Sequence, residues 1–316
     1  MQNTFESRPK AKPARIAAKR ASETMLQRMV KRYRRHRMAM IGLFILIAIT
    51  LYVLMGSFFV TERYANETDF ANKWAAPSIS HPFGTDAAGR DVLARTIYGG
   101  QVTMIISLLA MLVTAILGTV LGLLSGYYGG GIDSLIMRFS EALLSIPLLF
   151  LLLVVSKFIG AQTASVTVLG REFSGSVLIV ILILGFTGWM GLARIVRAQV
   201  LSLREQDFVT AARAVGARSG YIVFRHIMPN ALTSVIVYTT LGISNVILLE
   251  AYIGFLGTGV QPPTASWGNM IQRATEKIDS AWWMWFFPGV LILLTVLSIN
   301  FIGDGLRDAL DPYSNK

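Results

Sequence analysis

Residues 39–60, AMIGLFILIAITLYVLMGSFFV, contain no charged side chain and are long enough to cross a hydrocarbon core, which takes about 20 apolar residues. The preceding residues 1–38 are rich in Lys and Arg, with only Glu6 and Glu23 as acidic residues. A basic tail is also typical of nucleic-acid binding. Because this tail leads directly into an apolar run, the positive-inside rule explains it better. We therefore predict a transmembrane helix over 39–61 behind a basic cytoplasmic tail, and no nucleic-acid partner.

The composition of the whole chain also points to a membrane. Of its 316 residues, 53% are hydrophobic and 15% are charged, with a mean hydropathy of +0.56, whereas soluble domains are about 25% charged. Cysteine is absent, which excludes disulfides, zinc–thiolate sites and thiol catalysis, and we predict no metal site. The basic region and the apolar run are both too long for a cleavable signal, so the first helix is expected to stay in the mature protein.

Further apolar stretches predict an all-α integral membrane protein with six transmembrane helices. The stretches cover 39–60, 102–126, 135–158, 176–193, 232–256 and 282–302. An even number of spans returns the C-terminus to the side of the N-terminus. We therefore expect an external segment over 62–101, a membrane core over 102–303 and a cytoplasmic C-terminal tail over 304–316.

The orientation agrees with the basic residues that follow the fourth stretch, which this topology places in the cytoplasm. They are Arg194, Arg197, Arg204, Arg213, Arg218 and Arg225.

Small and aromatic residues mark particular spans. Gly118, Gly122 and Gly126 lie four apart, so they share one helix face and permit close packing, either within the chain or at a subunit interface. Pro147 removes a backbone donor and should kink the third span. Three tryptophans at the outer end of the sixth span are typical of an aromatic belt at the membrane surface. They are Trp282, Trp283 and Trp285.

Charges at membrane depth are costly and need a partner or a function. Arg138 and Glu141 lie three apart, which predicts an ion pair near the cytoplasmic start of the third span. Glu250 follows a run of apolar residues in the fifth span. A lone carboxylate there either lines a polar pathway or is buried and hydrogen-bonded in a structural role, and the structural role is the better interpretation.

The segment 203–230, LREQDFVTAARAVGARSGYIVFRHIMPN, predicts two short helices at an angle. Leu203–Val215 has helical spacing, and Gly216 suits the left-handed residue that ends a helix. Tyr221, Phe224 and Ile227 would give a second helix an apolar face, before Pro229 marks the turn into the fifth span. The first helix presents small residues rimmed by arginines. From the residues alone, this pattern indicates either a docking surface for another protein or an interfacial helix pair.

The same segment resembles the coupling loop of ABC-importer permeases, whose pattern is Glu-Ala-Ala, three residues, Gly, and then Pro. Thr210-Ala211-Ala212 stands in the place of the triplet, Gly216 matches the glycine, and Pro229 follows at the usual interval. Thr210 replaces the glutamate, which removes one carboxylate from the docking surface.

Three other stretches are similar to the oligopeptide and dipeptide permeases, so the resemblance covers roughly residues 36–313. They are His81-Pro82-Phe83-Gly84-Thr85-Asp86 with Gly89-Arg90-Asp91-Val92-Leu93, then Gly254-Phe255-Leu256-Gly257 with Gln261-Pro262-Pro263 and Ser266-Trp267-Gly268, and finally Gly303–Pro312. The chain resembles the C-type permease of the peptide and nickel class.

This resemblance implies an ABC type I importer permease fold with cytoplasmic coupling helices in a bacterial inner membrane. It implies as partners a homologous second permease, two ATP-binding cassette subunits and an external solute-binding protein. The chain has no Walker A sequence. We therefore expect a transport subunit rather than an enzyme, with no cofactor bound directly and with ATP and Mg²⁺ bound by those ATPase subunits. The residues expected to contact the ATPase are Thr210, Ala211, Ala212, Arg213, Gly216, Ala217, Arg218, Arg225, His226 and Pro229.

Other candidate residues and functions stay open. Asp86, Arg90, Asp91 and Glu250 could line the pathway or meet an external partner, but local caps and salt bridges are favoured for the first three, with Asp86 as a helix N-cap. An ion-coupled secondary transporter would need acidic residues at mid-membrane, and only Glu250 qualifies. An intramembrane serine protease would need a histidine at depth, and all three histidines fall outside the spans. The substrate could be a dipeptide, an oligopeptide, glutathione, a nickel chelate or an antimicrobial peptide. The basic tail could bind anionic lipid, contact an ATPase subunit or be disordered.

Overall fold

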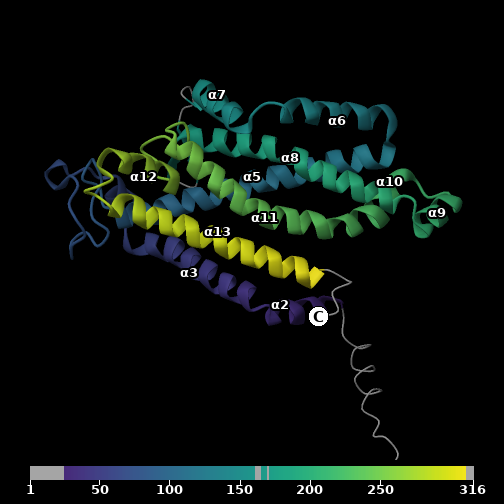
Figure 1. Cartoon of the computed structure of the whole chain (residues 1–316), viewed down its shortest axis with the longest axis horizontal. Helices are drawn as coiled ribbons and strands as arrows, with labels where there is room; N and C mark the ends of the chain where they lie inside the picture. The colour runs from purple at the N-terminus through teal and green to yellow at the C-terminus, as the bar shows by residue number, and fades with distance from the viewer. Residues whose placement is uncertain (1–24, 161–164, 169–170, 311–316) are drawn as a thin grey trace, which may run out of the picture.

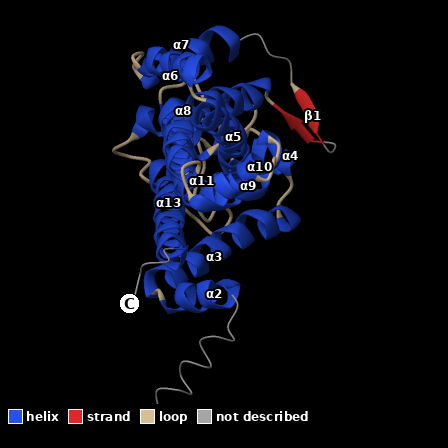
Figure 2. Ribbon diagram, turned by 90° about the vertical axis from the view of Figure 1, so that its right-hand side faces the viewer, coloured by secondary structure: helices blue, strands red, loops and turns tan. Residues whose placement is uncertain are grey.

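The computed structural model describes residues 25–160, 165–168 and 171–310, and this part of the chain is almost entirely helical. The strands are β1 (Val166–Val168) and β2 (Arg171–Phe173), an antiparallel pair in which Val166 lies opposite Phe173. Figure 2 shows this small ribbon at the margin of the helices, between α7 and α8 in sequence.

Long apolar helices run roughly along the long axis of the molecule (Figure 1). They are α3 (Arg37–Phe59), α5 (Val92–Tyr128), α8 (Gly175–Leu203), α11 (Met228–Phe255) and α13 (Trp283–Leu310). Five helices in the described residues are long and apolar enough to cross a membrane, and a sixth span results if one bent pair is counted as a span. The predicted six-helix membrane fold is thus confirmed.

The bent span joins α6 (Gly130–Leu144) to α7 (Leu148–Gly160), and the two parts meet at an angle of 82°. Pro147 lies in the break, as predicted, because it has no N–H to continue the helix. The predicted ion pair between Arg138 and Glu141 is wrong, since both side chains are exposed and form no ion pair in the structure. Asp133 makes the ion pair of this helix instead, with Arg197 of α8 at 2.5 Å.

Shorter elements lie beyond the two ends of the long helices (Figure 1). The end that carries α2 (Met25–Arg35), α9 (Asp207–Ala214) and α10 (Ser219–Ile222) is referred to as the basic end. The opposite end is the capped end. Its elements are α4 (Glu62–Asn66), η1 (Phe70–Asn72), α12 (Trp267–Ala274) and η3 (Thr275–Lys277).

Several helices extend beyond the apolar stretches that predict them. α5 begins at Val92, not at 102, and α13 continues past 303 to Leu310. The additional turns contain polar residues such as Arg95 and Gln101, which lower the hydropathy but find partners in the folded chain. Arg95 Nη1 donates to Asn66 Oδ1 at 3.0 Å, and Gln101 Nε2 donates to the Val53 carbonyl at 2.9 Å.

The contact between α5 and α8 depends on glycines of both helices. A Cβ on Gly122 would lie 2.7 Å from the Ala193 carbonyl oxygen, and one on Gly126 would lie 2.7 Å from Val200 Cβ. At Gly185 of α8 a Cβ would lie 2.7 Å from Val113 Cβ. Small residues let backbones approach in membranes, where packing rather than hydrophobic exclusion holds helices together. The glycine face of α5 is therefore an internal packing surface.

The aromatic-belt prediction is wrong for one of the three tryptophans. Trp282 and Trp285 are exposed, as a belt requires, but Trp283 is buried. Its Nε1–H donates to the Thr85 carbonyl at 3.1 Å, so it ties the last span to the capped end. The sequence shows three neighbouring tryptophans, and helical rotation turns the middle one inward.

We predict that Gly122→Ala destabilises the protein by about 1–3 kcal/mol, because the added methyl meets the Ala193 carbonyl, which belongs to the backbone and cannot move aside. The measurement is the thermal midpoint of the purified chain in detergent. Gly289→Ala is the matched control, since a Cβ at Gly289 of α13 has no neighbour within 4 Å. Equal midpoints for the two variants would contradict the packing role of the α5 glycine face.

Candidate functional site

The segment between α8 and α11 begins with α9, which ends in a Schellman motif. Gly216 has a φ of +80°, as the sequence predicts. Its N–H donates to the Arg213 carbonyl at 2.9 Å, and the Ala217 N–H donates to the Ala212 carbonyl at 3.0 Å. A Cβ at Gly216 would meet nothing within 4 Å. The requirement for glycine here therefore comes from the left-handed backbone alone.

The predicted turn at Pro229 is wrong, because the second helix does not end there. Residues Ser219–Phe255 form one continuous helix that passes through a π-helical turn, η2 (Val223–Ile227). Pro229 is the second residue of α11 and directly follows the π-helical turn, where the backbone hydrogen-bond pattern of the helix changes. Asn230 Nδ2 supplies a donor to the His226 carbonyl at 2.6 Å. The loop is thus rigidly continuous with the fifth predicted span.

A small apolar core holds the segment against the spans. Val209, Ile222, Val223 and Ile227 are buried, and they pack in one cluster with residues of α5, α8 and α11. The partners in that cluster are Leu123, Leu192, Val196, Val200 and Val235. Of the apolar face predicted for the second helix, only Ile227 points inward, because the helix is rotated so that Ile222 and Val223 take the inner positions.

The opposite side of the segment is uncovered and combines apolar with basic side chains. Val215 is 85% exposed and Phe224 is 65% exposed, which is unusual for side chains of this size next to a packed core. We refer to this set of residues as the loop surface. It consists of the exposed residues Phe208, Arg213, Val215, Arg218, Tyr221, Phe224 and Arg225.

The remaining predicted coupling residues lie on or beside the loop surface. Thr210 and Ala211 are exposed, and Ala212 and Ala217 are half-buried. His226 lies between the two helices, with its ring centroid 6.2 Å from that of Phe208 and 5.6 Å from that of Tyr221. It therefore links α9 to η2 by aromatic packing.

Ionic contacts connect this end of α8 to its neighbours. Arg197 donates from Nε and Nη2 to the two oxygens of Asp133, at 2.5 and 2.6 Å. Ser125 of α5 donates to the same carboxylate. Arg204, the last-turn residue of α8, donates to the Gly126 carbonyl at 3.2 Å. These contacts join this end of α8 to α5 and α6.

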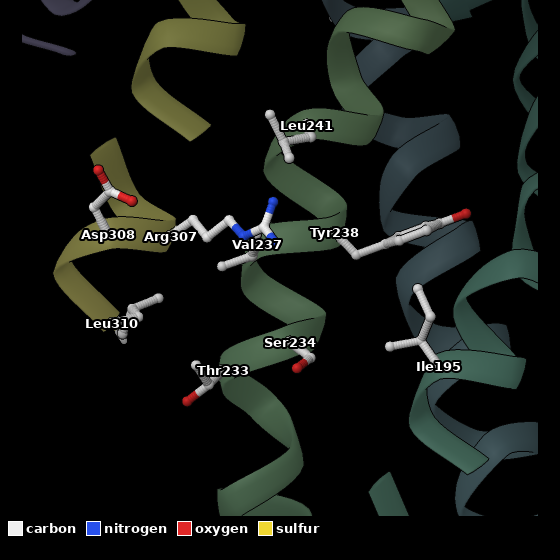
Figure 3. A pocket seen from close by; sticks show the side chains of 9 residues that line it. All are labelled: Ile195, Thr233, Ser234, Val237, Tyr238, Leu241, Arg307, Asp308 and Leu310. Atoms are coloured by element: carbon white, nitrogen blue, oxygen red, sulfur yellow. The ribbon is translucent and has the colours of Figure 1, made fainter. Parts of the chain in front are cut away.

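A groove of about 510 Å³ opens between α8, α11 and α13 toward the basic end. Figure 3 shows Ser234 and Tyr238 projecting from α11 beside Ile195 of α8, and Arg307 reaching across from α13. Gln199 Nε2 donates to Ser234 Oγ at 2.5 Å, which fixes one wall of the groove. The groove has polar and apolar walls, and sequence patterns gave no signal for it because its residues come from three separate helices.

At the capped end, the structure brings Asp86, Arg90 and Asp91 together but buries all three. Asp86 accepts from Arg90 Nε at 2.8 Å and from the Ala88 and Arg90 backbone N–H groups. Burial by itself would raise the pKa of Asp86, but the hydrogen bond and charge of Arg90, with the charge of Arg95, lower it. The predicted N-cap role of Asp86 is wrong. Asp91 caps α5 instead, by accepting from the Ala94 N–H at 2.8 Å.

Arg95 is a member of this cluster that the sequence analysis missed. It is 1% exposed, and its Nε lies 3.8 Å from Asp86 Oδ2. The sequence does not predict its burial, because Arg95 falls within the segment 62–101 that is expected to be external. The available signal was a fourth charge close behind Asp86, Arg90 and Asp91.

Glu250 is fully buried where three helices meet. Thr103 of α5 donates to Glu250 Oε2 at 3.1 Å, and the same hydroxyl accepts from the Trp267 backbone N–H of α12 at 3.2 Å. The Trp267 indole N–H donates to the Thr96 carbonyl at 2.9 Å. This geometry is that of a polar joint between α5, α11 and α12, as the structural interpretation expects. No cluster of His, Asp and Glu in the described residues could hold a metal ion.

Comparison with known proteins agrees with this architecture. Residues 118–315 match the family model described as binding-protein-dependent transport system inner membrane component, and residues 24–77 match the N-terminal TM domain of oligopeptide transport permease C. The chain's fold is also similar to an inward-facing structure of the MetNI methionine ABC transporter, with a TM-score of 0.53 and 21% identity over 67% of this chain and 94% of that one. The predicted ABC importer permease fold is confirmed.

Curated relatives are more similar in sequence. The dipeptide transport system permease protein DppC of Alkalihalophilus pseudofirmus is 40% identical over 89% of this chain and 88% of its own length. The oligopeptide transport system permease protein OppC of Haemophilus influenzae is 38% identical over 89% and 86%. OppC of Bacillus subtilis is 35% identical over 100% and 98%. The chain therefore belongs to the binding-protein-dependent inner-membrane transport components, as a permease subunit of the oligopeptide and dipeptide ABC transporter family.

Proposed function

We propose that this chain imports peptides or similar small solutes as one of two permeases in an ATP-driven complex, and that the segment 203–230 couples it to separate ATPase subunits. The partners are a homologous second permease, two ATP-binding cassette subunits that hold ATP and Mg²⁺, and an external solute-binding protein. The loop surface is the observation that carries the proposal. Val215, Phe224 and their neighbours leave apolar area uncovered, and Arg213, Arg218 and Arg225 around it are suited to carboxylates of a protein partner.

The anchoring of this segment supports a lever role. Its buried side packs on α5, α8 and α11, and Ser219–Phe255 is one helix, so movement of the loop surface moves a whole span. Shifting a two-state equilibrium from 1:99 to 99:1 takes about 5.5 kcal/mol of differential binding. Closure of the ATP-bound subunits would supply this free energy. The packed segment then needs only to transmit the movement to the spans without bending.

The proposed orientation places the basic end in the cytoplasm of a bacterium and the capped end outside. Two features at the basic end support it: α2 and the loop surface are both rich in Lys and Arg, as cytoplasmic flanks are. The solute-binding protein would then meet the capped end. Asp86, Arg90 and Asp91 would stabilise the fold of that surface rather than contact the binding protein directly, because their side chains are only 4 to 6% exposed. The second permease and membrane lipid would cover the exposed apolar sides of the spans.

An ion-coupled secondary transporter is the alternative function. Such proteins place titratable groups near mid-membrane in a cavity. Glu250 is the acidic residue considered for that role, and it is enclosed by Thr103 and Trp267 rather than open to a cavity. This packing favours the ATP-driven proposal.

We predict that Gly216→Val uncouples transport from ATP hydrolysis in the reconstituted complex. A β-branched residue at a φ of +80° costs about 1–2 kcal/mol or more and should undo the Schellman motif that sets the angle between α9 and α10. The measurement is solute uptake per ATP hydrolysed in proteoliposomes. We expect ATPase activity to persist while uptake falls several-fold.

Gly220→Ala is the matched control for Gly216→Val. Gly220 also has open space around it but lies in the helical region of backbone conformation, so alanine should be tolerated there. A normal ratio of uptake to hydrolysis in Gly216→Val, or an equal loss in Gly220→Ala, would overturn the lever role.

A second measurement separates the two functions. Uptake of a labelled peptide in membrane vesicles should be abolished by vanadate and should persist when an ionophore collapses the proton gradient, provided ATP is present. Uptake that resists vanadate but is abolished by the ionophore would support the secondary-transporter function instead.

A further inference from the structure

α2 is a basic helix held in a fixed place at the edge of the membrane-spanning bundle. Residues 25–37, MLQRMVKRYRRHR, contain no acidic side chain. Sequence alone left open whether this part of the tail is ordered. The structure places residues 25–35 in a helix beside the last turns of α13 (Figure 1).

Three contacts fix the position of α2. His36 interrupts the helix between α2 and α3, and its Nδ1 accepts from the Ala39 backbone N–H at 3.1 Å. The Nε2 of the same ring lies 3.6 Å from Asp308 Oδ2 near the end of α13. Tyr33 packs against Gly305 of α13, where a Cβ would come within 3.3 Å of the ring. The inner face of α2 is thereby occupied by the protein itself.

The outer face of α2 is open and carries its charge. Gln27, Val30, Lys31, Arg34 and Arg35 follow helical spacing, so they share one side, and all five are exposed. Val30, an apolar residue among cations, is 49% exposed. On a face of this kind, the cations can bind lipid phosphate groups, and the apolar side chain can enter the boundary between the headgroups and the acyl chains.

The distance to the bilayer surface is set by the chain. α3 is a membrane span that begins at Arg37, and His36 is the single residue between it and α2. Lys31 to Arg35 therefore lie two to six residues before the start of the span, which is about 3–9 Å along the chain at 1.5 Å per helical residue. This is at most about one Debye length at physiological salt, so these charges lie within reach of the surface potential of the membrane.

We propose that the outer face of α2 binds the headgroups of anionic phospholipids. Charge complementarity identifies the occupant: Lys31, Arg32, Arg34 and Arg35 fall within five residues of one helix, which is fixed at the level where headgroups lie. Because His36, Tyr33 and Asp308 hold the helix in place, little ordering is needed on binding. Lipid binding by α2 needs no partner subunit, so the experiment uses the full chain alone in neutral detergent, and its outcome is independent of ATP coupling.

The absence of cysteine allows a site-specific probe. Val30→Cys is labelled with an environment-sensitive fluorophore, and phosphatidylglycerol is titrated into the delipidated chain. We expect a saturable change in fluorescence, which phosphatidylcholine and inorganic phosphate do not produce. In the same labelled background, Lys31→Gln with Arg34→Gln and Arg35→Gln should raise the lipid concentration at half-saturation at least about tenfold.

The matched control removes three exposed cations from the capped end, by Arg63→Gln with Lys73→Gln and Lys277→Gln. It should change the half-saturation by less than about twofold, because these charges lie many Debye lengths from the probe. Circular dichroism verifies that both triple variants are folded.

Three outcomes would overturn the proposal. One is unchanged affinity in the α2 variant, or an equal loss in the control. Another is saturation by inorganic phosphate, which would make the face a free-anion site. The third is a response to purified ATPase subunits with none to phosphatidylglycerol, which would assign the face to a protein partner.

Discussion

The close approach of α5 and α8 is the contact on which the rest of the molecule depends. Glycines on both helices remove the side chains that would keep the backbones apart, and Thr114 Oγ1 donates to the Gly185 carbonyl at 3.1 Å across the interface. In a bilayer, such packing replaces the hydrophobic effect as the force between helices. α8 leads into the loop surface, and α5 begins at the buried charges of the capped end. The two ends of the protein are therefore joined through a single tightly packed pair.

Most of the fold follows from patterns that the sequence displays directly. Charge-free runs such as 39–60 locate the spans, Pro147 locates the break in the third, and Gly216 locates the end of α9. The errors in the helix boundaries have a common physical cause. Arg95 and Gln101 lower the hydropathy of helix turns that are nevertheless formed, because partners distant in sequence satisfy them. A hydropathy scale reflects the free energy that burying a polar side chain costs. It contains no information on the hydrogen-bond partner that offsets this cost in the folded chain.

Rotation about a helix axis was the second source of error. The predicted inner face of the second coupling helix contained Tyr221 and Phe224, yet Ile222 and Val223 are the buried residues. The π-helical turn at Val223–Ile227 changes the helical phase, so a pattern counted at 3.6 residues per turn cannot carry across it. The exposed aromatic residues that result are what make the loop surface recognisable as a site. The candidate residues themselves, from Thr210 to Pro229, follow from resemblance more than from periodicity.

The hydrogen bond from Trp283 to the Thr85 carbonyl joins residues 198 positions apart. It sets the order in which the protein can be completed during synthesis. The segment before α5 is synthesised early, but the tryptophan that anchors it belongs to α13 and is synthesised much later. α3 is in the same position, since its main packing partner is α13. The first span and the capped end therefore gain their contacts with α13 only after it has been synthesised, and until then both pack on α5 alone or on other helices.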